Sequence, residues 1–168
     1  LIDLSNKGFI DYDIEQKRIK VKERLYNYIL ASGGKTDYDV IVFNSLTEGD
    51  DNATLNLLNY DMLMKGIDRI FLSDSQNVVI YPQKGEVLLK KNRDFDFAGL
   101  IRAGKFEFFG KEYNFSYDDF KIDLVNVDSC RIYVENFEDR DDVERTGKPR
   151  LVRVKNVLEG IRGVLSID

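Results

Sequence analysis

The sequence predicts a mainly β protein, and three observations support this fold class. Apolar and polar residues alternate with a period of two along most of the 168 residues. The breaks between the alternating runs are short and rich in turn residues, as in NYD, DSQN, PQKG and KNRD. They leave no room for crossover helices, so we expect many short strands in an open sandwich, a meander or a short β-solenoid.

The first part of the chain is expected to hold a hairpin and a further strand. The alternating runs at 8–14 and 18–21 flank the polar residues EQK, which predicts a β-hairpin. The run DYDVIVFNSL at 37–46 predicts another strand, and an acidic loop at 47–52 follows it.

Residues 24–34 lie between these elements and fit two structures. Leu25, Tyr28 and Ile29 would share one face of a helix, and Gly33 would end it. The aromatic content of the segment also suits a strand. We therefore expect at most one helix, near residues 24–32.

The rest of the chain is predicted to be a succession of short strands within one domain that spans residues 1–168. The segment 135–150 is the longest polar stretch, and we expect a mobile loop there. The weakest joint of the domain is expected near 47–52. Because the chain lacks an initiator Met and ends in strand-like alternation, we expect it to be a fragment of a larger protein. The predicted strands have the sequences ATLNLL, MLMKGI, RIFLSD, NVVIYP, EVLLKK, FDFAGLI, KFEFFG, YNFSYD, FKIDLVNV and LVRVKNVLEGIRGVLSID.

The missing residue types exclude several kinds of chemistry. The chain has no His, which excludes Ser-His-Asp and Cys-His catalysis. Its one cysteine, Cys130, cannot form an internal disulfide or a zinc site, and its apolar surroundings predict a buried thiol. The acidic clusters at 48–52 and 138–145 do not fit a calcium loop. We therefore predict no catalytic, cofactor or metal residue and favour a non-enzymatic role, while carboxylate, Lys or Tyr chemistry stays open.

The overall charge argues against a nucleic-acid partner. The net charge is −5 and the pI is about 4.9, whereas surfaces that bind nucleic acid are usually basic. No nucleic acid is expected among the partners.

The stretch from Gly99 to Lys105 matches the opening of a phosphate-binding loop, G-x-x-x-x-G-K. Phe106 stands where such a loop needs Ser or Thr, and the following residues alternate like strands instead of opening a helix. We reject this interpretation. Gly99, Gly104 and Gly110 are expected to mark bends, bulges or tight turns.

A series of apolar, mostly aromatic side chains is the one candidate binding site. It can be read in two ways, as a filled core or as an apolar trough that meets a ligand. This predicted stripe comprises Phe106, Phe108, Phe115, Tyr117, Phe120 and Ile122.

The segment AGLIRAGKFEFFGKEYNFSYDDFKIDL, within residues 98–124, resembles a recurrent segment of AsmA/TamB-type and LptA-like envelope bridge proteins. The resemblance rests on a G-x-aromatic-x-aromatic-aromatic-G turn followed by a strand of the F-x-I-x-L kind. Stretches elsewhere are similar to very large, uncharacterised envelope proteins of Gram-negative bacteria. The resemblance implies an open β-structure with an apolar groove that shields lipid chains, and a location in the cell envelope or periplasm. The matching positions are Gly104, Phe106, Phe108, Phe109, Gly110, Phe115, Phe120 and Ile122.

Three functions follow from these observations. The first is a non-enzymatic, β-rich structural or interaction domain of a large bacterial envelope protein, whose partners are the flanking domains and, through edge strands, a second copy. The second is a lipid-groove bridge protein that carries acyl chains. The third is a carboxylate-based enzyme that acts on glycans.

Overall fold

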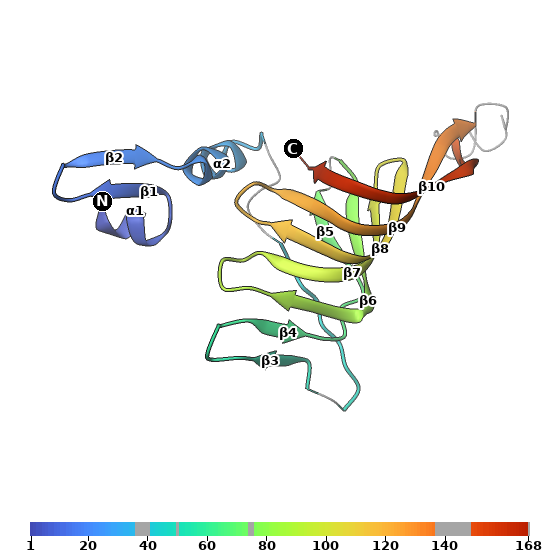
Figure 1. Cartoon of the computed structure of the whole chain (residues 1–168), viewed down its shortest axis with the longest axis horizontal. Coiled ribbons are helices and arrows are strands. Elements are labelled where there is room, and N and C mark those ends of the chain that lie inside the picture. The colour runs from blue at the N-terminus through green and yellow to red at the C-terminus, as the bar shows by residue number, and fades with distance from the viewer. Residues whose placement is uncertain (36–40, 50, 74–75, 137–148, 168) are drawn as a thin grey trace.

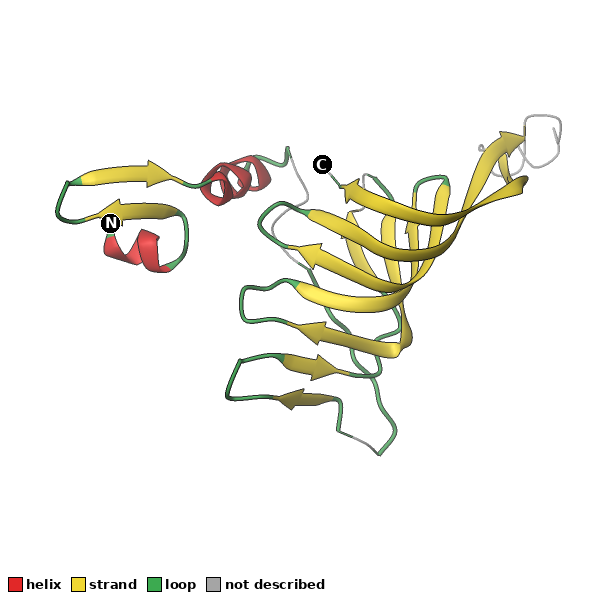
Figure 2. Ribbon diagram, in the orientation of Figure 1, coloured by secondary structure: helices red, strands yellow, loops and turns green. Residues whose placement is uncertain are grey.

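The computed structural model describes residues 1–35, 41–49, 51–73, 76–136 and 149–167. It is mainly β, which confirms the predicted fold class (Figures 1 and 2). Most of the strands form one open antiparallel sheet, and a smaller N-terminal unit with its own two-stranded sheet lies to one side of it.

The N-terminal unit, residues 1–34, is called the arm below. It contains two helices and a two-stranded hairpin: α1 (Ile2–Asn6), β1 (Ile10–Asp13), β2 (Arg18–Val21) and α2 (Glu23–Ser32). The predicted hairpin is confirmed, with Ile10 paired to Val21. The ambiguous segment is the helix α2, and the one-turn helix α1 is an addition that the sequence pattern did not indicate.

The main sheet contains eight strands: β3 (Ala53–Leu55), β4 (Met62–Met64), β5 (Ile70–Ser73), β6 (Val78–Leu89), β7 (Phe95–Ala103), β8 (Phe106–Ser116), β9 (Lys121–Asn136) and β10 (Arg150–Ser166). Their order across the sheet is β10-β9-β8-β7-β6-β4-β3, and β5 also pairs with β6. From β6 to β10 every strand pairs with the next one along the chain, so the architecture is an antiparallel meander.

The predicted strand at 37–46 is wrong for residues 41–46, which form only an isolated bridge between Ser45 and Ile67. Residues 37–40 lie outside the described residues, as do 137–148 of the expected loop at 135–150 and residue 50 of the expected joint. Two of the apolar residues in this stretch, Ile41 and Phe43, pack against the core without joining the sheet, whereas Val42 and Leu46 are exposed. The Phe43 ring packs edge-on against the Phe95 ring, with centroids 5.4 Å apart.

Several of the short predicted strands are halves of longer, bent strands. NVVIYP and EVLLKK together make β6, and KFEFFG and YNFSYD together make β8. The pairing register shifts at neighbouring positions of successive strands, where Pro82 pairs with Gly99, Gly99 with Gly110, and Gly110 with Val127. Bulges locally bend and twist a strand, so this row of irregularities curves the sheet around its core (Figure 2).

Two glycines are required along this bend, as predicted. Gly99 has a φ of +135°, and a Cβ there would lie 2.3 Å from the Tyr81 carbonyl oxygen. A Cβ on Gly110 would lie 2.5 Å from the Asn126 carbonyl oxygen. Both contacts are too close for any side chain, so glycine allows the backbones to approach.

The curved sheet encloses a core dominated by aromatic rings. The Phe95 and Phe115 rings stack with centroids 4.6 Å apart, and Phe120 meets Phe115 edge-on at 5.5 Å. Such pairs stabilise a core beyond the area that they bury. Cys130 is also buried, as predicted, and burial raises the pKa of its thiol.

Candidate functional site

The structure divides the predicted stripe into two groups. Phe115, Tyr117, Phe120 and Ile122 lie in the core, and Phe115 is only 1% exposed. These four side chains fill the interior of the bent sheet, and none of them lines the pockets described below.

Phe106 and Phe108 lie at the start of β8, and Phe108 is partly buried against the edge of the core. Phe106 is 43% exposed, and its ring stacks near that of Phe108 with centroids 6.2 Å apart. Both line a pocket of about 390 Å³. The wall of this pocket is mainly apolar, and the Lys105 amino group at its rim is ion-paired to Glu135 at 2.9 Å. The other lining residues are Gln76, Val78, Ala103, Gly104, Leu165 and Ser166.

The phosphate-loop lookalike lies across a β-hairpin. Gly99 is inside β7, and Gly104 and Lys105 form the turn between β7 and β8, where Gly104 has a φ of +56°. A working phosphate loop needs a helix N-terminus next to the phosphates, whereas here a strand follows the turn directly.

The most enclosed described carboxylate belongs to Glu107 on β8, which is 7% exposed. Its Oε1 accepts hydrogen bonds from Arg102 Nε at 3.1 Å and Nη2 at 2.9 Å, and its Oε2 accepts one from the Tyr133 hydroxyl at 2.8 Å. This contact raises the pKa of Tyr133. Since both oxygens are engaged by neighbouring strands, Glu107 clamps β7, β8 and β9 together. Within the described residues, no group of three or more His, Cys, Asp or Glu is arranged to hold a metal ion.

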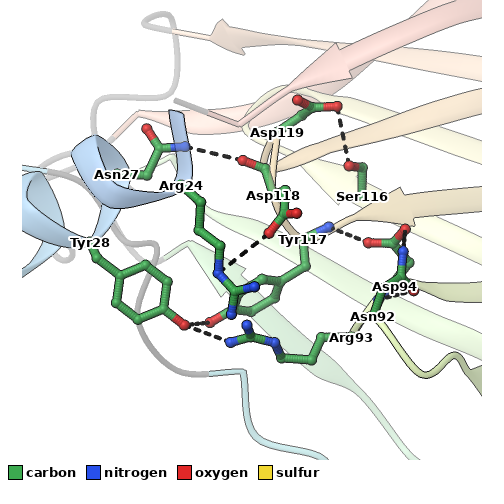
Figure 3. A network of polar contacts seen from close by, with 10 residues as sticks. All are labelled: Arg24, Asn27, Tyr28, Asn92, Arg93, Asp94, Ser116, Tyr117, Asp118 and Asp119. Carbon is green, nitrogen blue, oxygen red and sulfur yellow. Dashed lines mark hydrogen bonds and ion pairs between the residues drawn. The ribbon is translucent and has the colours of Figure 1, made fainter. Parts of the chain in front are cut away.

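A polar network, the junction, connects the arm to the sheet (Figure 3). Asp118, in the turn between β8 and β9, contacts two side chains of α2. Asn27 Nδ2 donates a hydrogen bond to its carbonyl oxygen at 3.1 Å, and Arg24 Nε forms an ion pair with its Oδ1 at 3.7 Å. Arg93, in the turn between β6 and β7, donates from Nη1 to the Tyr28 hydroxyl at 2.6 Å. These contacts hold α2 against the β6–β7 and β8–β9 turns.

The junction continues through two tyrosines. The Tyr28 hydroxyl lies 3.3 Å from the Tyr117 hydroxyl. Burial, followed by the hydrogen bond with Tyr117, raises the pKa of Tyr28 to about 12, although the nearby Arg24 acts in the opposite direction. The Arg93 guanidinium lies over the Tyr117 ring, 4.5 Å from its centroid, and the Tyr117 amide donates to Asp94 Oδ1 at 2.8 Å.

Sequence reasoning missed the junction because its partners are distant along the chain. The contact between Asn27 and Asp118 spans 91 positions, and that between Tyr28 and Arg93 spans 65. The one available signal was the helical face that includes Tyr28.

A second pocket opens beside the junction and has a volume of about 440 Å³. It differs from the first pocket because its lining combines three basic side chains with two aromatic rings. The lining residues are Asn6, Lys7, Gly8, Phe9, Arg24, Tyr28 and Arg93.

The chain matches no protein-family model, no curated protein and no solved structure. The resemblance of residues 98–124 to envelope bridge proteins therefore stays a prediction. Of the described helices, none is long and apolar enough to span a membrane.

Proposed function

We propose that the chain is a non-enzymatic, β-rich structural or interaction domain of a larger bacterial envelope protein. The observation that carries this proposal is the burial of four of the six stripe residues, Phe115, Tyr117, Phe120 and Ile122. Phe115, Phe120 and Ile122 pack inside the curved sheet, where they stabilise the fold and have no surface left for a ligand. A domain of this kind contributes a stable body and a contact surface.

The arm is the contact surface that we favour. Among its residues, all of which the structure describes, only Ile10 and Ala31 are buried. Many of its large apolar side chains face solvent, and a concentration of such side chains is typical of protein contact sites. We propose that the flanking domains of the same protein cover them. The exposed set comprises Leu1, Ile2, Leu4, Ile14, Ile19, Val21, Tyr26, Ile29 and Leu30.

The outer edge of β10 is the other surface that a partner could use, and a second copy could pair with it there. This edge carries Arg153, Lys155 and Arg162, and its pairing with β9 is interrupted at two register shifts. Charges and bulges are the usual protection of an edge strand against pairing. We therefore favour the arm over this edge.

Photo-crosslinking tests the role of the arm. A photoreactive amino acid replaces Ile29 on α2, which is 58% exposed, and in a matched variant it replaces Lys111, which is exposed on β8. In the full parent polypeptide, we expect position 29 to crosslink to flanking domains of the same chain and position 111 to give little product. Equal yields from both positions, or none from position 29, would contradict the proposal.

The pocket at Phe106 and Phe108 supports a second candidate function, the binding of an acyl chain. Its wall is mainly apolar and Phe106 is largely uncovered. Uptake of a fluorescent fatty acid that is lost in Phe106→Asp and retained in the matched variant Phe71→Asp would favour this candidate, because Phe71 is also exposed but does not line the pocket.

A further inference from the structure

We propose that the pocket beside the junction binds a small anionic ligand, with its phosphate or carboxylate group on the arginines and an aromatic or apolar body against the rings. This inference is independent of the proposed function, because it concerns a different surface and a different kind of partner.

The charge of the lining argues for an anion. Lys7, Arg24 and Arg93 all line the pocket, and none of its described lining residues is acidic. Lys7 is ion-paired to Asp3 outside the lining at 3.0 Å, so the two arginines are the main anion-binding groups. Arg93 forms no ion pair with any carboxylate of the described residues, and its Nη1 donates only to a neutral hydroxyl, that of Tyr28. Guanidinium groups bind phosphate and carboxylate through paired hydrogen bonds. Arg93 therefore brings an unneutralised positive charge to the pocket wall.

Arg24 adds a second guanidinium with unused hydrogen-bonding capacity. Its side chain is 16% exposed, and its Nε is buried without a hydrogen bond to any described group, since the Asp118 carboxylate is 3.7 Å away. A buried charged donor without a close acceptor is costly. A Cβ on Gly8 would lie 3.0 Å from Arg24 Nη1, so the absence of a side chain at Gly8 leaves this nitrogen open toward the pocket.

The aromatic rings indicate that the ligand is larger than a bare ion. Phe9 and Tyr28 meet edge-on with centroids 5.0 Å apart, and the Arg24 guanidinium lies 5.3 Å from the first ring and 5.6 Å from the second. The volume of about 440 Å³ leaves room for more than an oxyanion. An apolar or planar body attached to the anion would occupy the space beside the rings.

The pocket lies between the arm and the main sheet, so a bound ligand would connect these two parts of the chain. Arg24 belongs to α2 of the arm, whereas Arg93 belongs to the turn between β6 and β7 (Figure 3). An anion held by both would bridge the two units. Because a ligand that binds only the docked form stabilises that form, it would hold the arm against the sheet.

The test is an NMR titration of the full chain that follows the arginine Nε–Hε signals. The probes are phenyl phosphate and benzoate, which differ in the anionic group, and phenol, which has the ring without the charge. The variants are Arg93→Gln and Lys7→Gln. The matched control is Arg69→Gln, because the Arg69 guanidinium also lies over an aromatic ring, that of Phe71, but does not line the pocket.

We expect saturable shifts of the Arg24 and Arg93 signals with at least one of the two anions. Arg93→Gln should weaken the binding about tenfold, which corresponds to the loss of one charge-assisted hydrogen bond. Lys7→Gln should weaken it less, and Arg69→Gln should not change it. The stronger of the two anions identifies the group that the pocket prefers. Shifts that do not saturate, equal binding of phenol, or equal binding by Arg93→Gln and Arg69→Gln would overturn the proposal.

Discussion

Tyr113 carries a hydroxyl group that the fold buries without satisfying. The side chain is fully buried in the bend of the sheet, and its oxygen has no hydrogen-bond partner in the described part of the chain. Burial raises the pKa of this phenol. Tyr113→Phe removes only the hydroxyl, so we expect this variant to be more stable than the natural chain.

The magnitude follows from the two contributions of the hydroxyl. Leaving a buried hydroxyl unsatisfied costs about 1–3 kcal/mol. The ring keeps its packing, including the contact with Phe97 at a centroid distance of 5.1 Å, while the small gap left by the oxygen offsets part of the gain. We therefore expect the free energy of unfolding to rise by about 1 kcal/mol and the Tm by about 2–4 °C for a domain of this size.

Urea unfolding followed by circular dichroism measures the difference, because the chain has no Trp for fluorescence. Tyr133→Phe is the matched control, since it removes a hydroxyl that donates to Glu107 and should lower stability. If Tyr113→Phe lowered the free energy of unfolding by about 1 kcal/mol or more, its hydroxyl would be making a favourable hydrogen bond and the reasoning would be refuted.

Further predictions concern the bend, the core, the thiol and the junction. Gly99→Ala should destabilise the chain by more than about 2 kcal/mol in urea unfolding, because its backbone is strained for any side chain and the Cβ meets a carbonyl oxygen. Phe115→Ala should cost about 3–5 kcal/mol by the same measurement, whereas Phe106→Ala should cost much less because Phe106 is partly exposed. Cys130 should react with a thiol reagent only after unfolding, and fast reaction of the folded chain would contradict its burial. The pKa of Tyr28 is raised from 10.0 to about 12, so the unfolded chain loses this proton first. The stability that neutral Tyr28 provides should be fully present below pH 10 and lost as the pH rises toward 12, which unfolding at a series of pH values checks against Tyr28→Phe.

The strands were predictable because each half of a bent strand has one face toward the core and one toward solvent. The sequence pattern did not predict that two such halves continue through the bend as one strand. Phe108 occupies an even position and Phe115 an odd one, although both pack on the core side of the sheet. The register shifts near Gly110 change the phase within β8. In a period-two pattern, such a change of phase looks like the end of one strand and the start of another.

Neither the aromatic stripe nor the junction could be fully predicted from the sequence. Phe106 and Phe115 both lie in runs where aromatic and polar residues alternate. Which of the two rings is exposed and which is buried follows from the three-dimensional path of the sheet. The junction depends on Arg24, Tyr28 and Arg93, which the fold brings together from distant parts of the chain. Local patterns contain no information on such contacts. The glycines of the bend were predictable in role because Gly is the residue that permits close backbone approach.

The central claim is that the buried part of the stripe, Phe115, Tyr117, Phe120 and Ile122, is core and not a lipid groove. Fluorine NMR of the chain labelled with fluorophenylalanine, titrated with a fatty acid, tests this claim most directly, with Phe→Leu variants to assign the signals. We expect the signals of Phe115 and Phe120 to stay unchanged, and any response to be confined to the rings that line the surface pocket, Phe106 and Phe108. Saturable shifts of the Phe115 and Phe120 signals would place acyl chains inside the sheet and contradict the account.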